Sequence, residues 1–185
     1  MTQIVRRRSK EEFGPFPLED SQLPSYVNPV VPFPSVQLYL RWGEEKIRQL
    51  VRYHHCLLRL SDIPGFLPDD QKKFEIATEK TADFFVEVLS RGRFSKPIIG
   101  YPALKMRYFR ITVDEYAREV WLHLYRQAVI DMKMPSDCIE DFWNWIEPLS
   151  IWMINRKTGA SIRRYPYSDI WTELVEWKVS PKKAG

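Results

Sequence analysis

The sequence is poor in cysteine and lacks the short motifs of common catalytic and metal sites. Its two cysteines, Cys56 and Cys138, form no C-x-x-C pair. Each lies in a stretch with helical periodicity, so we expect two buried thiols in a reducing cytoplasm. There is no zinc-ligand spacing, Gly-rich phosphate loop, G-x-S-x-G or H-E-x-x-H, so the familiar metal-site, nucleotide-binding and hydrolase patterns are missing.

Long apolar runs and massed charge are missing as well. No N-terminal stretch has the length of a signal-peptide core, and no run approaches the roughly 20 apolar residues that span a bilayer. The net charge is +4, and the only dense basic runs are Arg6-Arg7-Arg8-Ser9-Lys10 and Lys182-Lys183. Because no stripe of Lys and Arg with interleaved aromatics follows a helix face, we expect no nucleic-acid partner. Because long apolar runs are missing, we expect a cytoplasmic protein with no transmembrane segment.

Aromatic residues, by contrast, are plentiful. They make up 14% of the 185 residues, and seven are tryptophan. This length is enough for one domain with a proper core. The excess favours a core of bulky side chains and leaves some aromatic surface for a protein partner.

Residues 1–35 read as an extended, proline-rich arm. Six prolines fall within twenty residues: Pro15, Pro17, Pro24, Pro29, Pro32 and Pro34. Each removes an N–H donor and biases the residue before it toward extended backbone. A disordered tail would carry fewer aromatics and valines, so we expect the arm to lie on a surface, its own or that of a partner.

Residues 36–157 have helical periodicity and form the predicted domain. Apolar residues recur there at three- and four-residue steps in five segments: 36–42, 44–61, 68–92, 112–133 and 134–157. Asp69 or Asp70 is placed to cap the third segment, and Thr112-Val-Asp-Glu115 reads as a capping box for the fourth. Residues 158–185 form a C-terminal extension with a short helix near 168–178, and the predicted fold class is all-α.

The stretch from Gly100 to Leu122 carries a family resemblance. It reads G-Y-P-A-L-K-M-R-Y-F-R-I-T-V-D-E-Y-A-R-E-V-W-L. It resembles the proximal region of truncated haemoglobins, written G-H-P-x-L-R-x-R-H-x-P-F-x-I and followed by a helix with A-W-L. The spacing fits without a gap, but Tyr108 stands where the family carries its iron-binding histidine.

Three further landmarks follow the family order. Trp42-Gly43-Glu44-Glu45-Lys46-Ile47 is similar to the G-G-x-x-x-I/F opening with one glycine missing, and the turn at Leu67-Pro68-Asp69 and the helix end at 84–89 stand at suitable distances. The resemblance, closest to the group II and III branches, implies a truncated-globin helical sandwich flanked by the arm and the extension.

The resemblance also implies a set of pocket residues. Tyr108 takes the proximal position, with Arg107 beside it, and Leu67 replaces the aromatic that packs on the porphyrin, with Phe66 beside it. On the ligand side, His55 stands for the distal tyrosine. Trp121 is the family tryptophan whose indole N–H faces the bound ligand, whereas Ser90-Arg91 replaces a double glycine.

These departures leave the iron chemistry open. Tyr108 can ligate as a phenolate, a hard ligand suited to ferric iron. Alternatively, His55 binds iron from the distal side, or Tyr108 fills the pocket and no haem binds. His54 and His55 also have a plainer reading as hydrogen-bonded core histidines, since adjacent side chains point about 100° apart on a helix and cannot face one metal from the same side.

Two functions of different class therefore remain. The first is a degenerate globin without conventional haem–oxygen chemistry, acting as a structural or interaction subunit that docks a protein partner or a second copy through its arm and extension. The second is a haem protein with Tyr108 or His55 as iron ligand, active in redox, sensing or peroxide chemistry. The sequence does not settle whether the protein is an enzyme, although a non-enzymatic role fits the missing catalytic motifs better.

Overall fold

The computed structural model describes residues 29–63, 65–91, 112–156, 158 and 162–171. Within them every regular element is a helix: α1 (Gln37–Trp42), α2 (Glu44–Leu60), α3 (Gln71–Arg91), α5 (Glu115–Asp131), α6 (Ser136–Trp152) and α7 (Tyr167–Trp171). The all-α prediction is confirmed. Helix α2 begins and ends within one residue of the expected 44–61, whereas α6 begins near the expected 134 but ends at Trp152, before the expected 157.

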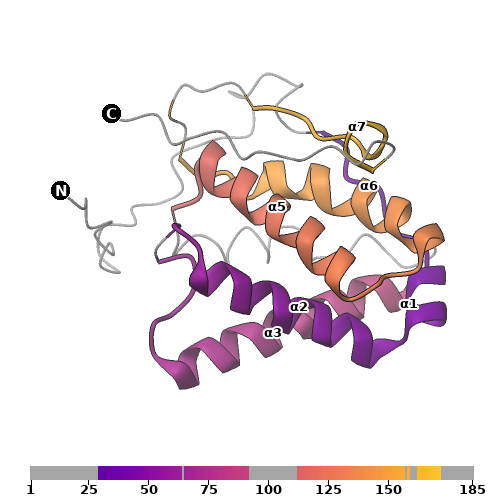
Figure 1. Ribbon diagram of the computed structural model, residues 1–185, viewed down its shortest axis with the longest axis horizontal. Helices are drawn as coiled ribbons and strands as arrows, with labels where there is room; N and C mark the ends of the chain where they lie inside the picture. Colours follow the sequence, from indigo (N-terminus) through magenta and orange to yellow (C-terminus); the bar gives the residue numbers. More distant parts are fainter. Residues whose placement is uncertain (1–28, 64, 92–111, 157, 159–161, 172–185) are drawn as a thin grey trace.

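The helices form two stacked pairs. Figure 1 shows α2 and α3 together beneath α5 and α6, with α7 above α6 and α1 at one end. Helices α2 and α3 run antiparallel. Arg48 near the start of α2 pairs with Asp83 in the second half of α3, and Arg59 at the end of α2 pairs with Gln71 at the start of α3. The short α1 contacts both α3 and α6, so it joins the two pairs at that end.

Helix starts agree with the sequence at one site and differ at another. Asp70 accepts a hydrogen bond from the backbone N–H of Lys73 at 2.9 Å, as the expected cap of α3. The capping box proposed for α5 is wrong, because the N-cap is Asp114, which accepts from the N–H of Ala117. The Glu115 carboxylate is instead bonded to the hydroxyl and the N–H of Thr158, so it ties the start of α5 to the loop after α6.

An aromatic cluster fills the space where α3, α5 and α6 meet. Phe85 lies 5.8 Å from Tyr125 and 5.0 Å from Trp145, and Tyr125 lies 5.9 Å from Phe142, measured between ring centroids. All four side chains are buried. Such pairs stabilise by about 0.5–1.5 kcal/mol beyond their buried area, so the cluster is a major part of the core that joins both helix pairs.

The described end of the arm lies on the chain's own α6. The indole N–H of Trp152 donates to the carbonyl of Pro29 at 2.9 Å, and the N–H of Ser35 donates to the Asp141 carboxylate at 2.6 Å. Residues 29–35 therefore pack on the predicted domain across its expected boundary at residue 36. Residues 1–28 lie outside the described part, so docking of the whole arm stays a prediction.

A buried ionic cluster fastens the segment before α7 to the core. Arg118 of α5 and Glu147 of α6 are each 2% exposed and pair at 2.7 Å. The same arginine donates to the Ser150 hydroxyl and to the carbonyl of Arg163. Burial lowers the pKa of Arg118, against the attraction of Glu147, but an arginine stays protonated in proteins. A buried charge pair thus joins α5 to α6 inside the core.

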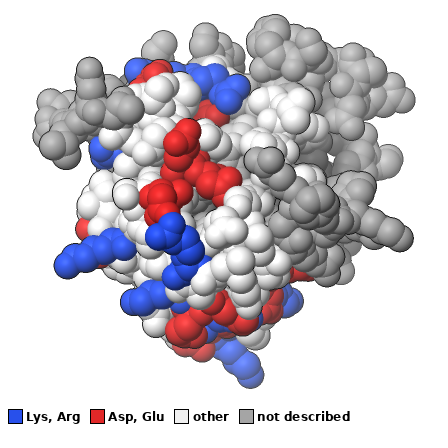
Figure 2. Space-filling model, turned by 90° about the vertical axis from the view of Figure 1, so that its right-hand side faces the viewer, with Lys and Arg blue, Asp and Glu red and all other residues white. Residues whose placement is uncertain are grey.

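The surface of the described helices carries one thiol and charges of both signs (Figure 2). Cys138 is buried as expected, but Cys56 is exposed. It shares a face of α2 with Leu60, four residues later, which is exposed as well. Figure 2 shows basic and acidic side chains intermixed on the described part of one face, with no basic stripe crossing it. None of the described helices is long and apolar enough to cross a membrane.

Candidate functional site

The first of two adjacent histidines in α2 faces α5. His54 is completely buried, and its ring stacks on Tyr125 at 3.4 Å with an interplanar angle of 16°. Its Nε2 is hydrogen-bonded to the carbonyl of Trp121 at 3.0 Å, and the Trp121 indole meets the imidazole edge-on at 5.4 Å. Trp121 and Tyr125, one turn apart on α5, therefore hold this ring.

The second histidine faces α3. The His55 ring is 3% exposed, and its Nδ1 is 2.8 Å from the hydroxyl of Thr78. The ring of Phe74, one turn earlier in α3, lies 6.5 Å away. Because consecutive helical side chains diverge by about 100°, the pair divides between two interfaces, as the sequence spacing indicated.

Both imidazoles are held in the neutral form. Burial lowers the pKa of His55 to about 4. Burial and the neighbouring His55 bring the pKa of His54 well below its usual range, despite the hydrogen bond to Trp121. A neutral imidazole can donate from one nitrogen and accept, or bind a metal, through the other.

Two buried nitrogen atoms at the α2–α5 interface lack a hydrogen-bond partner among the described residues. They are Nδ1 of His54 and Nε1 of Trp121. A buried polar group left unsatisfied costs about 1–3 kcal/mol, and most such groups in native proteins are bonded. Nδ1 of His55, by contrast, is hydrogen-bonded to Thr78. The α2–α5 interface therefore contains two buried nitrogen atoms that its own packing leaves without a hydrogen bond.

The remaining predicted site residues are placed in part. Trp121 is buried as expected, Phe66 is buried and Leu67 is half-buried against the main core. Tyr108 and Arg107 lie outside the described residues. Within those residues no group of three or more His, Cys, Asp and Glu side chains could hold a metal ion.

Sequence reasoning missed two contributors to this site. Tyr125 follows Trp121 by four residues, so it shares its face of α5, and that spacing was the available signal. Thr78 follows Phe74 by four residues in α3 and so shares its face, but a polar side chain is not counted in an apolar periodicity. Both contact the histidines directly.

Acid is expected to destabilise the chain through these histidines. The folded pKa of His55 is about 4, whereas its ordinary value is 6.5. The unfolded chain therefore binds more protons between those values, and the free energy of unfolding falls as the pH drops from about 6.5 to 4, by about 3 kcal/mol for this group. Urea unfolding of haem-free wild type and His55→Gln at several pH values checks this, because the variant should lose that part of the slope. Equal slopes would contradict the assignment.

Comparisons with known proteins agree with the fold. The family model described as bacterial-like globin matches residues 40–155. Among solved structures, the chain is similar to the crystal structure of phosphate-bound Hell's gate globin IV, with 41% sequence identity and a TM-score of 0.69. That match covers 78% of this chain and 91% of the other. Comparison with curated proteins gave no match.

Proposed function

This chain belongs to the bacterial-like globin family, and on that premise we propose that it binds haem, with α2 and α5 facing the ligand side of the iron. Bound haem would supply an iron centre for small ligands, in redox, sensing or peroxide chemistry. The truncated-globin fold expected from the sequence supports the proposal, as does the likeness over most of the chain to a solved globin.

The unsatisfied nitrogen pair is the observation that carries this proposal. Nδ1 of His54 and Nε1 of Trp121 are buried without a partner among the described residues. A core that served packing alone would be more stable with apolar groups there, because the desolvation cost would vanish. A small polar ligand that reached either nitrogen would satisfy it. In the resemblance noted from the sequence, the tryptophan N–H has that role.

The iron ligand itself is proposed from the sequence. Tyr108 is the first candidate, with the cation of Arg107 beside it in the chain favouring the phenolate. His55 is the second, and burial already keeps its imidazole neutral, as ligation requires. Its Nδ1 is engaged by Thr78, so only Nε2 would be available for a metal.

Absorption spectra of the full chain test the proposal. Protein from haem-replete cells, in buffer without phosphate because the similar solved globin is phosphate-bound, is expected to show a Soret band. Tyr108→Phe keeps the ring but removes the oxygen ligand, so haem content should drop sharply while the circular dichroism spectrum stays unchanged. Tyr108→His should give a histidine-type ferrous spectrum.

Matched variants separate the two candidate ligands. Tyr39→Phe makes the same chemical change at a half-buried tyrosine of α1, and it should leave the Soret band intact. If Tyr108→Phe matches wild type in haem content and spectrum, Tyr108 is not the ligand. His55→Leu then becomes the variant expected to lose haem.

A structural or interaction subunit is the second candidate function. It is favoured by the His54–Tyr125 stack, which leaves no space between the two rings at 3.4 Å, and by the arm residues, of which Val30 is 90% exposed. In that case wild type would be purified without a Soret band, and titration with haemin would give only the spectrum of free haemin. Light scattering of the full chain would then be expected to report an assembly or a bound protein partner.

A further inference from the structure

A row of arginines on α2 runs through His55. Arg48, Arg52 and Arg59 stand with His55 at steps of four, three and four residues, the spacing of a single helix face. Each of the three arginines bonds to α3 or to the turn before it. The face of α2 that presents His55 to α3 is therefore also the face that carries its ionic contacts.

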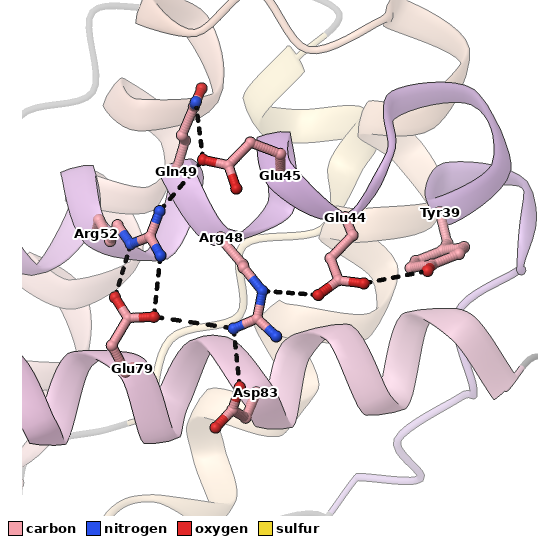
Figure 3. Close-up of polar contacts among 8 residues, drawn as sticks. All are labelled: Tyr39, Glu44, Glu45, Arg48, Gln49, Arg52, Glu79 and Asp83. Carbon is pink, nitrogen blue, oxygen red and sulfur yellow. Dashed lines mark hydrogen bonds and ion pairs between the residues drawn. The ribbon is translucent and has the colours of Figure 1, made fainter.

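The contacts set the antiparallel register of the two helices. Arg48 donates to the Asp83 carboxylate at 2.8 Å and Arg59 donates to the Gln71 side chain at 2.6 Å. Between them, Arg52 forms a two-point fork on Glu79, with Nε and Nη2 at 2.7 and 3.0 Å from the two carboxylate oxygens. Figure 3 shows Arg48 and Arg52 reaching across from α2 to Glu79 and Asp83 of α3.

The fork is the contact closest to His55 along both helices. Arg52 precedes His55 by less than one turn of α2, and Glu79 directly follows Thr78, the partner of His55 Nδ1. We infer that Arg52 and Glu79 are a positioning pair for His55, holding the Thr78 hydroxyl opposite Nδ1 and so fixing the direction of Nε2. The bearing of that direction on haem chemistry rests on the proposed function.

The fork is suited to positioning rather than to stabilising. A bidentate arginine–carboxylate pair fixes two points of a plane, so it restricts both sliding and rotation of one helix against the other. Its side chains are 42% and 45% exposed, and exposed ion pairs contribute little to folding stability. Removing the fork should therefore disturb the geometry at His55 while leaving the stability of the chain almost unchanged.

Nitrogen-15 NMR of the two α2 imidazoles tests this in the full chain without added haem. In wild type, the two ring nitrogens of His55 should show the distinct chemical shifts of a single neutral tautomer, fixed by the hydrogen bond between Nδ1 and Thr78. In Arg52→Gln and in Glu79→Gln, that pattern should shift toward tautomer averaging while the His54 signals stay in place. The charge-reversed double variant Arg52→Glu/Glu79→Arg should restore the wild-type pattern at least in part.

Arg41→Gln is the matched control, because Arg41 of α1 makes an exposed ion pair with Asp137 of α6, away from the α2–α3 interface. It should leave His55 unchanged, and its urea midpoint should differ from wild type about as little as that of Arg52→Gln. Unchanged His55 signals in both fork variants, or an equal change in the control, would overturn the inference. Because no haem is needed, these signals are independent of the Soret band that decides the proposed function.

Discussion

Replacing Glu147 by glutamine is expected to lower the free energy of unfolding by about 3–5 kcal/mol, the usual cost of leaving a buried charge without its partner. The carboxylate is 2% exposed, and it accepts from the guanidinium groups of Arg118 and Arg164 and from the N–H of Tyr165. The glutamine keeps the volume but removes the negative charge opposite Arg118. Urea unfolding at neutral pH measures the loss.

Two further variants separate the charge pair from other effects. Glu140→Gln makes the same change on the exposed face of the same helix, and it should stay within about 0.5 kcal/mol of wild type. The double variant Arg118→Met/Glu147→Met should be more stable than Glu147→Met alone, since a buried pair replaced by apolar groups leaves no orphaned charge. A loss below about 1 kcal/mol for Glu147→Gln would mean that water reaches the pair.

Trp121→Ala should cost about 3–5 kcal/mol, the range for removing a large aromatic from a core. The indole is 2% exposed and packs edge-on against both His54 and Tyr125, with ring centroids 5.4 and 4.6 Å away. The substitution leaves a cavity between α2 and α5 and removes one wall around the His54 ring. Denaturant unfolding of the haem-free chain checks the value.

A second tryptophan gives the contrast. Trp121→Phe removes an N–H that has no partner among the described residues, so the haem-free chain should lose only the packing lost with the smaller ring, whereas Trp152→Phe also removes a hydrogen bond to Pro29. If Trp121→Phe costs as much as Trp121→Ala, the loss exceeds that of the smaller ring, the indole nitrogen is satisfied, and the main support for a ligand at it is gone. A cost below about 1 kcal/mol for Trp121→Ala would place the indole near solvent.

Periodicity and order of landmarks were enough to predict the helices. The fold depends on where apolar residues recur, and that information is local: α2 spans Glu44–Leu60 against an expected 44–61. The α5 cap failed for a non-local reason. The spacing of Thr112 and Glu115 matched a capping box. In the structure, however, Glu115 is bonded to Thr158, 43 residues away along the chain, and Asp114 is the N-cap.

The candidate site was predictable only where it is carried by the family pattern. His55 and Trp121 were identified by position, and both are buried in the structure. The buried pair of Arg118 and Glu147 was not foreseen, because two opposite charges at apolar phases of separate helices become a pair only once those helices pack. The proximal position of Tyr108 rests on the sequence alone, since it lies outside the described residues.

The flat contact between His54 and Tyr125 has a magnetic consequence. With the rings 3.4 Å apart and 16° from parallel, the carbon-bound protons of His54 lie over the face of the phenol, where the ring current shields them and moves their resonances upfield. Neither ring near His55 is stacked on it: the Phe74 phenyl ring is tilted at 6.5 Å and the His54 imidazole is tilted at 5.9 Å, so its protons should resonate closer to ordinary values. Two consecutive histidines of nearly equal burial can thus be told apart in a one-dimensional spectrum, without isotope labelling or substitution.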